Sequence, residues 1–179
     1  MEYQISEPEV EILLNDLMEI YGYDFTSYSR ASLVRRINRL FSLDKHPSFA
    51  EFRYRVRNDD SYLKHLVESL TVNVTEMFRD PEFYQAIREK VIPVLQTYPL
   101  IRIWHAGCST GEEVYSMAIL LKEANLLNKS LLYATDISPM VLDVARKGVF
   151  PLRMMKQYSE NYIASGGKYD FSDYYTANY

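Results

Sequence analysis

The sequence predicts an all-α helical bundle over residues 1–70, followed over residues 71–179 by a linker and the first part of an α/β domain. Two observations carry this prediction. Apolar residues recur at the three- and four-residue spacing of amphipathic helices throughout the first part. In the second part, two short apolar runs at 101–105 and 131–135 alternate with helical patterns, which is typical of a parallel sheet with crossover helices.

Four helices are predicted in the first part, and together they can form a small bundle. Ser6 and Glu9 make the signature of a capping box, and Gly22 ends the first helix. Ser48 and Glu51 make the same signature at the start of the third helix, which runs to Val56. The apolar positions are Val10, Leu13, Leu14, Leu17 and Tyr21 in the first helix, Leu33, Val34, Ile37, Leu40 and Phe41 in the second, and Leu63, Leu66, Val67 and Leu70 in the fourth.

The second part begins with an irregular stretch over residues 71–79 that we interpret as a linker. Asp80 and Pro81 then start a helix, because aspartate caps helix N-termini and proline suits the first helical position. The remaining predicted elements are a strand at 101–105, a helix at 112–124, a strand at 131–135, a helix from Ser138 to Gly148, and a tyrosine-rich stretch after it.

Two strands are too few for a stable parallel sheet, which needs both faces covered and usually has about four or more strands. We therefore expect the α/β domain to be incomplete at its C-terminus, residue Tyr179. Apolar surface left uncovered in such a domain favours self-association, including exchange of strands between copies of the chain.

Composition indicates a globular protein, because 47% of the residues are hydrophobic and 25% are charged. No apolar run approaches the roughly 18–20 residues of a membrane helix, and the N-terminus lacks the basic and apolar regions of a secretory signal. A single cysteine rules out an internal disulfide and fits a reducing compartment. We therefore expect a cytoplasmic protein without membrane insertion.

The net charge of −4 conceals an uneven distribution along the chain. Residues 1–29 hold seven acidic residues and no lysine or arginine, whereas residues 30–57 hold eight basic residues against two acidic ones. The second helix carries Arg35, Arg36 and Arg39 opposite its apolar arc, and such a face suits docking of an acidic partner. An ordinary solvated face that pairs with the acidic first helix is the alternative. The acidic pI of about 5.4 disfavours nucleic acid as the partner.

The stretch 106–116, Ala-Gly-Cys-Ser-Thr-Gly-Glu-Glu-Val-Tyr-Ser, joins a predicted strand to a predicted helix, where α/β proteins let a ligand approach the backbone. A phosphate loop of the G-x-x-x-x-G-K-[ST] type needs a lysine, whereas this turn ends in Glu112 and Glu113, which repel phosphate. The spacing of Gly107 and Gly111 also differs from G-x-G-x-x-G. The turn therefore favours a nucleoside without phosphates, and S-adenosyl-L-methionine, with its cationic sulfonium, suits it. A plain connection whose glutamates interact with the helix dipole is the alternative.

Two further features favour a nucleoside site. Asp136 stands at the end of the second predicted strand, where an acidic side chain can bind both hydroxyls of a ribose. Capping of the next helix beside Ser138 is the alternative role. In the polar stretch 73–80, Arg79 can pair bidentately with the α-carboxylate of the ligand, and a linker with a surface arginine is the alternative.

Taken together, these residues resemble the chemotaxis-receptor glutamate methyltransferases, the CheR family. The resemblance covers nearly the whole chain in the order of the family's motifs. The matching positions are Asn73, Thr75, Phe78 and Arg79 for Asn-x-Thr-x-x-Phe-Arg; Ala106, Ser109–Glu113, Tyr115 and Ser116 for Ala-x-x-Ser-Thr-Gly-Glu-Glu-x-Tyr-Ser; Thr135, Asp136 and Ile137 for Ser/Thr-Asp-Ile; and Gly22–Phe25, Tyr28, Ser32, Leu33, Arg35–Ile37 and Arg39 for the N-terminal helices.

The resemblance implies that the α/β part is the beginning of a Rossmann-like methyltransferase domain that uses S-adenosyl-L-methionine. The implied reaction converts glutamate side chains in the acidic cytoplasmic helices of chemoreceptors, or of related signalling proteins, into methyl esters and releases S-adenosyl-L-homocysteine. Arg35, Arg36 and Arg39 are then the docking residues, and Arg79 is the residue assigned to catalysis. The implied cofactor-binding residues are Asn73, Thr75, Arg79, Ala106, Gly107, Gly111, Glu113, Asp136 and Ile137.

Methyl transfer to a carboxylate needs no strong general base, because glutamate is already ionised at pH 7. It needs in-line approach to the methyl carbon and desolvation of the nucleophile. The sequence accordingly offers no Ser-His-Asp, Cys-His or metal-binding pattern: His46, His65 and His105 are scattered, and Cys108 is a small residue of the turn. A noncatalytic S-adenosyl-L-methionine-sensing or protein-interaction module is the alternative function.

Overall fold

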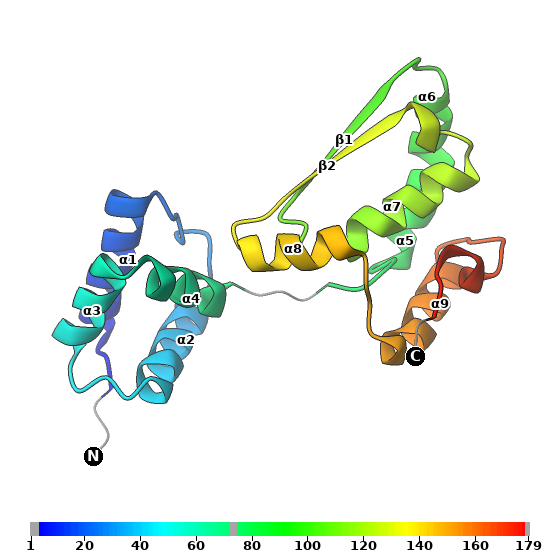
Figure 1. Cartoon of the computed structure of the whole chain (residues 1–179). Coiled ribbons are helices and arrows are strands. Elements are labelled where there is room, and N and C mark those ends of the chain that lie inside the picture. The colour runs from blue at the N-terminus through cyan, green and yellow to red at the C-terminus, as the bar shows by residue number, and fades with distance from the viewer. Residues whose placement is uncertain (1–3, 72–74, 178–179) are drawn as a thin grey trace. The chain divides into compact units, whose positions relative to one another are not determined.

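The computed structural model describes residues 4–71 and 75–177. The chain divides into two compact units, Met1–Val72 and Asn73–Tyr179 (Figure 1). The first unit is entirely helical, and the second combines helices with a small parallel sheet. The predicted fold class, an all-α bundle followed by a partial α/β unit, is confirmed.

The caps of the first unit follow the sequence signals. The Ser6 backbone N–H donates to the Glu9 carboxylate at 2.8 Å, and Gly22 ends the first helix with a φ of +77°. Ser48 accepts from the Glu51 N–H at 3.3 Å at the start of the third helix. The helices are α1 (Glu7–Tyr21), α2 (Arg30–Leu43), α3 (Phe49–Asn58) and α4 (Asp60–Leu70), and their apolar faces form one core.

The second unit opens with a helical segment that has an irregular middle. The predicted helix after Asp80 exists, but its backbone ladder widens into a π-helical turn, because Pro93 has no N–H to donate to the carbonyl one turn back. The three parts of this segment are α5 (Pro81–Ala86), η1 (Ile87–Val91) and α6 (Ile92–Gln96).

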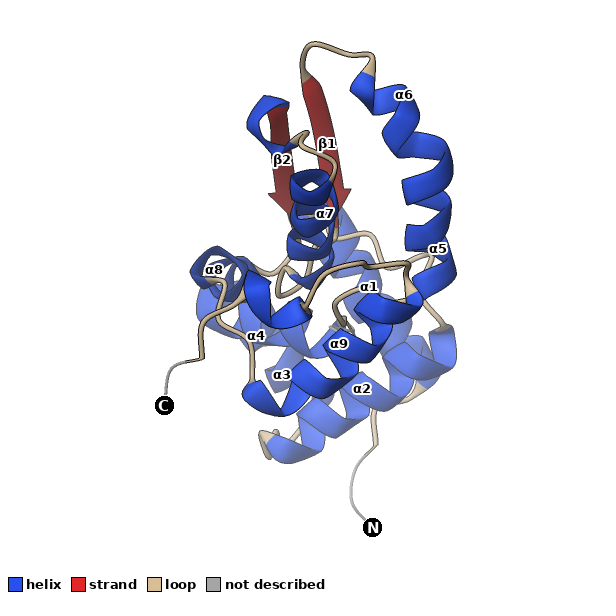
Figure 2. Cartoon of the chain, turned by 90° about the vertical axis from the view of Figure 1, so that its right-hand side faces the viewer, coloured by secondary structure: helices blue, strands red, loops and turns tan. Residues whose placement is uncertain are grey.

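Two parallel strands, β1 (Ile101–Ala106) and β2 (Ser130–Thr135), form the sheet, and α7 (Glu112–Glu123) connects them and lies along one of its faces (Figure 2). Side chains alternate along β1, so Ile101 and Ile103 join the core that α7 covers. On the opposite face, Trp104 of β1 and its register partner Tyr133 of β2 are 69% and 48% exposed. One face of the sheet is therefore covered and the other carries exposed aromatic side chains.

The second strand leads into α8 (Pro139–Lys147), and a further helix, α9 (Met155–Ala164), follows it. Our prediction missed α9, although Met155, Tyr158 and Tyr162 keep helical spacing, because the tyrosines and the following Gly166–Gly167 gave that stretch a loop-like composition. Tyr158 and Tyr162 are fully buried. No helix in the described part of the chain is long and apolar enough to span a bilayer. The short 3-10 turns are η2 (Leu127–Lys129), η3 (Leu152–Met154) and η4 (Phe171–Tyr174).

Candidate functional site

The turn between β1 and α7 lies at the carboxyl end of both strands (Figure 2). The backbone N–H groups of Gly107 and Cys108 both donate to the Thr135 carbonyl, at 2.8 and 2.9 Å. Gly107 and Gly111 have φ values of +74° and +97°, which glycine adopts without steric cost. A Cβ at Gly111 would meet Ala145 of α8 at 3.0 Å, whereas one at Gly107 would meet nothing within 4 Å. Gly111 therefore permits close helix packing, and Gly107 presents bare backbone to open space.

Asp136 links the end of β2 to this turn. Its Oδ2 accepts from the Ser109 N–H at 2.8 Å, and its Oδ1 accepts from the Ser138 N–H at 3.0 Å. The second bond fixes the backbone just before α8, whose N-cap residue is Ser138, without capping a helical N–H group, and the first ties the carboxylate to the glycine turn. Asp136 itself is half-buried, and its neighbour Ile137 is 41% exposed.

The stretch before α5 is held against the first turn of α7. The buried Phe78 N–H donates to the Ser116 hydroxyl at 2.9 Å, and that hydroxyl donates to the Glu112 carbonyl at 2.7 Å. Ser116 is fully buried. Within this stretch Thr75 is half-buried and Arg79 is exposed, whereas Asn73 lies outside the described residues.

Three stretches far apart in the sequence thus meet at the carboxyl end of the strands. The Phe78–Ser116 bond brings the first to α7, and the Ser109–Asp136 bond brings the third to the turn. Ala106 is exposed at the end of β1. This edge of a parallel sheet is where α/β folds bind ligands. The predicted cofactor residues in the described part of the chain belong to these three stretches.

The two glutamates of the turn have different environments. Glu112 is buried and accepts from the Thr110 hydroxyl at 2.6 Å and from the Tyr158 hydroxyl at 3.4 Å. Burial and the Glu112 charge raise the pKa of Tyr158 to about 12. The Glu113 side chain is 57% exposed, and its Oε1 lies 2.8 Å from Nδ1 of His105. Glu113 is therefore the carboxylate of the turn that a ligand can reach.

Cys108 lies in the turn but has the environment of a structural residue. Its side chain is buried, and burial together with the nearby Asp136 charge raises the pKa of its thiol. A nucleophilic cysteine needs the opposite shift, toward thiolate. The described residues contain no group of three or more His, Cys, Asp or Glu side chains that could hold a metal ion.

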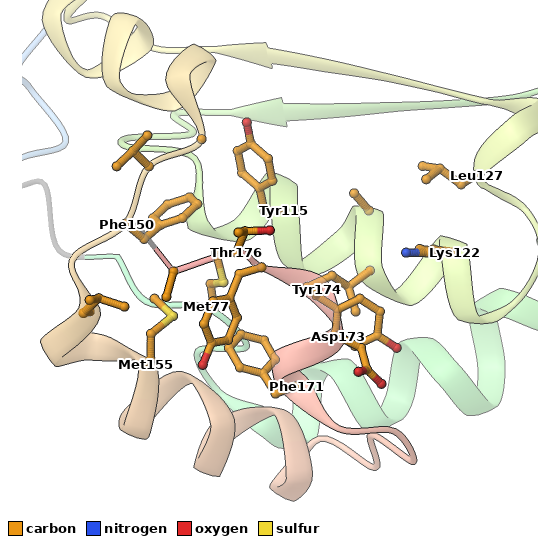
Figure 3. Close-up of a pocket in the computed structure, with 17 residues that line it drawn as sticks. Met77, Tyr115, Lys122, Leu127, Phe150, Met155, Phe171, Asp173, Tyr174 and Thr176 are labelled. Atoms are coloured by element: carbon orange, nitrogen blue, oxygen red, sulfur yellow. The ribbon is translucent and has the colours of Figure 1, made fainter. Parts of the chain in front are cut away.

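A cavity of about 440 Å³ lies beside α7, and none of the predicted cofactor residues lines it (Figure 3). Aromatic and sulfur-containing side chains dominate its wall, with Lys122 and Asp173 as charged members. Its lining from α7 and from the segment after α8 includes Tyr115 and Phe150, and residues 171–177 close another side. The polar groups suited to a nucleoside are at the glycine turn rather than in this cavity.

The three arginines of α2 differ in their surroundings. The Arg36 guanidinium donates to the carbonyls of Ser69 and Thr71, at 3.3 and 3.0 Å, and so closes the C-terminal end of α4. Arg35 and Arg39 are exposed, and they line a groove of about 480 Å³ that also includes Arg36, Leu40, Leu43, Asp44, His65 and Ser69.

The acidic helix α1 pairs with other arginines. Arg53 of α3 holds Asp16 with two hydrogen bonds, at 2.5 and 2.8 Å, and Arg30 pairs with Glu11. Hydrogen bonding to Arg53 lowers the pKa of Asp16. Among the described residues, Arg35 and Arg39 take part in none of the ion pairs.

Comparison with known proteins agrees with this geometry. The family described as CheR methyltransferase, all-alpha domain, matches residues 8–71, and the family described as CheR methyltransferase, SAM binding domain, matches residues 73–177. The chain belongs to the CheR methyltransferase family. The resemblance inferred from the sequence motifs is thereby confirmed, and a CheR domain that binds S-adenosyl-L-methionine agrees with the predicted cofactor.

CheR relatives come from several bacteria. The Pseudomonas putida KT2440 protein named Cher3 is 46% identical over 171 residues, which are 96% of this chain and 63% of the relative. A chemotaxis protein methyltransferase of Listeria innocua is 31% identical over 78% of this chain and 54% of its own length. Chemotaxis protein methyltransferase 2 of Pseudomonas aeruginosa is 37% identical over 72% of this chain and 47% of its own length. The chain thus spans roughly half of the curated CheR relatives it matches.

Sequence reasoning assigned no site role to two residues that make hydrogen bonds around the glycine turn. Ser116 was noted only as part of a motif, and His105 only as one of three scattered histidines. A small polar residue within the otherwise apolar face of α7 was the available signal for Ser116. For His105, the signal was a polar residue at an inward position of β1.

Proposed function

We propose that this protein is an S-adenosyl-L-methionine-dependent methyltransferase that esterifies glutamate side chains in the cytoplasmic helices of chemoreceptors. The observation that supports this proposal most strongly is the meeting of the 75–79 stretch, the glycine turn and Asp136 at one end of the strands. Relatives named chemotaxis protein methyltransferase support the chemotaxis setting.

The residues present suit a nucleoside cofactor without phosphates. Gly107 leaves open space beside the backbone, and the exposed carboxylate of Glu113 favours a cationic group over a phosphate. Asp136 is placed to accept hydrogen bonds from ribose hydroxyls at the end of β2. Arg79 is the group proposed to bind the cofactor's α-carboxylate and so to orient the methyl group. The remaining proposed contacts are Asn73, Thr75, Ala106, Gly111 and Ile137.

When bound, S-adenosyl-L-methionine would supply an activated methyl group to the glutamate oxygen, with S-adenosyl-L-homocysteine as the leaving group. Because the receptor carboxylate is ionised at pH 7, the reaction requires no strong general base from the protein. Its residues bind the two reactants, align them and exclude water, which are proximity and desolvation effects. Burial raises the pKa values of the Cys108 thiol and the Tyr158 hydroxyl, so both groups stay protonated at neutral pH. This agrees with a site that uses no general base.

Acidic receptor helices are proposed to dock on the exposed arginines of α2. Arg35 and Arg39 line the groove beside α4 and lie outside the ion pairs of the acidic first helix. Because Arg36 donates to carbonyls at the end of α4, its first contribution is to the stability of the bundle. Docking would use the field of all three charges, with Arg35 and Arg39 making contact.

A transfer assay tests the proposal. The chain is incubated with methyl-labelled S-adenosyl-L-methionine and a cytoplasmic chemoreceptor fragment, and the modified fragment is then treated with mild alkali. Release of labelled methanol identifies a methyl ester, and substitution of receptor glutamates by alanine should abolish the label. Binding of S-adenosyl-L-homocysteine without transfer would favour the noncatalytic module instead. Absence of both binding and transfer would overturn the proposed function for this chain.

A further inference from the structure

His105 is an inward-facing histidine next to the cofactor turn. It precedes the last residue of β1, and its side chain is only 3% exposed. Its Nδ1 lies 2.8 Å from Oε1 of Glu113, the exposed carboxylate of the turn. A buried ring thus reaches one of the residues proposed to face the cofactor.

The hydrogen bond to Glu113 determines which nitrogen of the His105 ring carries the proton. A carboxylate can only accept, so the proton of this bond is on Nδ1 of His105. The other ring nitrogen, Nε2, is buried without a hydrogen-bond partner in the described part of the chain. An unpartnered polar atom in the interior costs free energy, and an apolar side chain at this position would not carry that cost. Burying the ring therefore costs free energy at Nε2, and the hydrogen bond that the histidine makes among the described residues is the one from Nδ1 to Glu113.

We propose that His105 is a positioning residue that holds the Glu113 carboxylate in one orientation at the cofactor turn. This inference rests on the proposed function, in which Glu113 faces the cationic part of the cofactor. The Glu113 side chain is 57% exposed and has several rotatable bonds, so without a partner it would sample many rotamers. Ordering one such side chain on binding weakens affinity by about three- to tenfold. Because the His105 hydrogen bond already orders the Glu113 side chain in the free protein, binding does not incur this loss.

Two substitutions of the same residue separate positioning from packing. His105→Phe replaces the five-membered imidazole with a larger, apolar six-membered ring, so it keeps an aromatic ring in the buried site but removes the donor. His105→Asn loses ring volume but keeps an N–H donor on the atom next to Cγ, where Nδ1 sits. Calorimetric titration with S-adenosyl-L-homocysteine should show about three- to tenfold weaker binding for His105→Phe and near wild-type binding for His105→Asn. Thermal melting should show the reverse order, with His105→Asn the less stable protein.

Glu113 provides the second arm of the experiment. If His105 acts through this carboxylate, His105→Phe should not weaken binding further in a Glu113→Ala background. Wild-type binding by His105→Phe, affinities that follow thermal stability, or additive losses in the double variant would overturn the inference while leaving the proposed function intact. Failure of the wild-type chain to bind S-adenosyl-L-homocysteine would overturn the proposed function, and the positioning role with it.

Discussion

Replacing Ser116 with alanine tests the joint that brings the first motif to the cofactor turn. The Ser116 hydroxyl is fully buried and accepts from the Phe78 N–H at 2.9 Å. In Ser116→Ala this backbone donor is left in the interior without its acceptor. Such a group costs about 1–3 kcal/mol, so the folding equilibrium of the second unit should fall by roughly five- to 150-fold.

Urea unfolding followed by a probe in the second unit measures this loss as a lower midpoint at an unchanged m-value. The same variant should bind S-adenosyl-L-homocysteine more weakly, because the stretch that carries Thr75 and Arg79 is no longer fixed against α7.

Ser130→Ala is the matched control in the same unit. The Ser130 hydroxyl donates to the Leu126 carbonyl at 2.8 Å, and that carbonyl also accepts from the Lys129 N–H at 3.1 Å. Removing the hydroxyl therefore leaves the carbonyl a donor, and the cost should be about 1 kcal/mol or less. The reasoning is refuted if Ser116→Ala loses no more stability than Ser130→Ala and binds S-adenosyl-L-homocysteine as tightly as the wild type.

Four further outcomes are expected: one from the cofactor site, two from the helical bundle and one from the sheet. In calorimetric titration, Asp136→Ala should weaken S-adenosyl-L-homocysteine binding by about 1–3 kcal/mol, because ribose hydrogen bonds in a half-buried site are lost. In stopped-flow measurements, Arg35→Glu with Arg39→Glu should slow association with an acidic receptor fragment and flatten its salt dependence, because exposed charges act mainly on the on-rate and are screened over about 8–10 Å at physiological salt. Arg53 lowers the pKa of Asp16 in the folded state. The stabilisation from this pair is therefore complete above the unfolded pKa of about 3.9 and is lost as the pH falls through the lower folded pKa. Urea midpoints measured from about pH 5 to pH 2 should show this loss of stability, and the loss should be smaller in Asp16→Asn. The exposed aromatic face of the two-stranded sheet should make the chain self-associate, which sedimentation at several protein concentrations measures.

Each of these expectations has a contrary result. Unchanged affinity in Asp136→Ala would leave that residue with a structural role, through its bonds to the Ser109 and Ser138 N–H groups. Equal association rates and salt slopes in the charge-reversed protein would make the α2 face an ordinary solvated surface. Parallel pH profiles for Asp16→Asn and the wild type would remove the ion pair as a source of acid sensitivity. A monomer at every concentration, with fully protected strand amides, would show that the sheet needs no further cover.

Local structure was largely predictable, because its determinants lie within a few residues of one another. The capping bond from Ser6 to Glu9, the left-handed Gly22 and the Asp80–Pro81 helix start are each encoded within four residues. Both strands and their crossover helix were also predictable from alternating apolar runs. The helix α9 had a signal of the same kind in its tyrosine spacing, which its composition obscured.

The glycine turn and the motifs around it indicated the family from the sequence alone, and the match to the CheR methyltransferase, SAM binding domain, agrees with the cofactor they predicted. The residue types of the turn indicate its chemistry. Acidic side chains in place of a lysine disfavour phosphate, and a glycine lets a ligand approach the backbone. The order of these motifs along the chain added the specificity that a single glycine turn lacks.

Only the tertiary structure decided which side chains hold the site together. Phe78 and Ser116 are 38 residues apart, and Arg36 and Thr71 are 35 apart, so no local pattern pairs them. The same holds for the orphaned ring nitrogen of His105, which becomes visible only when the burial of β1 is known. Periodic burial of apolar side chains and helix capping depend on residues that are close together in the sequence. Hydrogen bonds between buried groups depend instead on how whole helices and strands pack. The sequence alone therefore determined most of the elements and the family, and packing determined that Arg36 holds the end of α4 while Arg35 and Arg39 stay exposed.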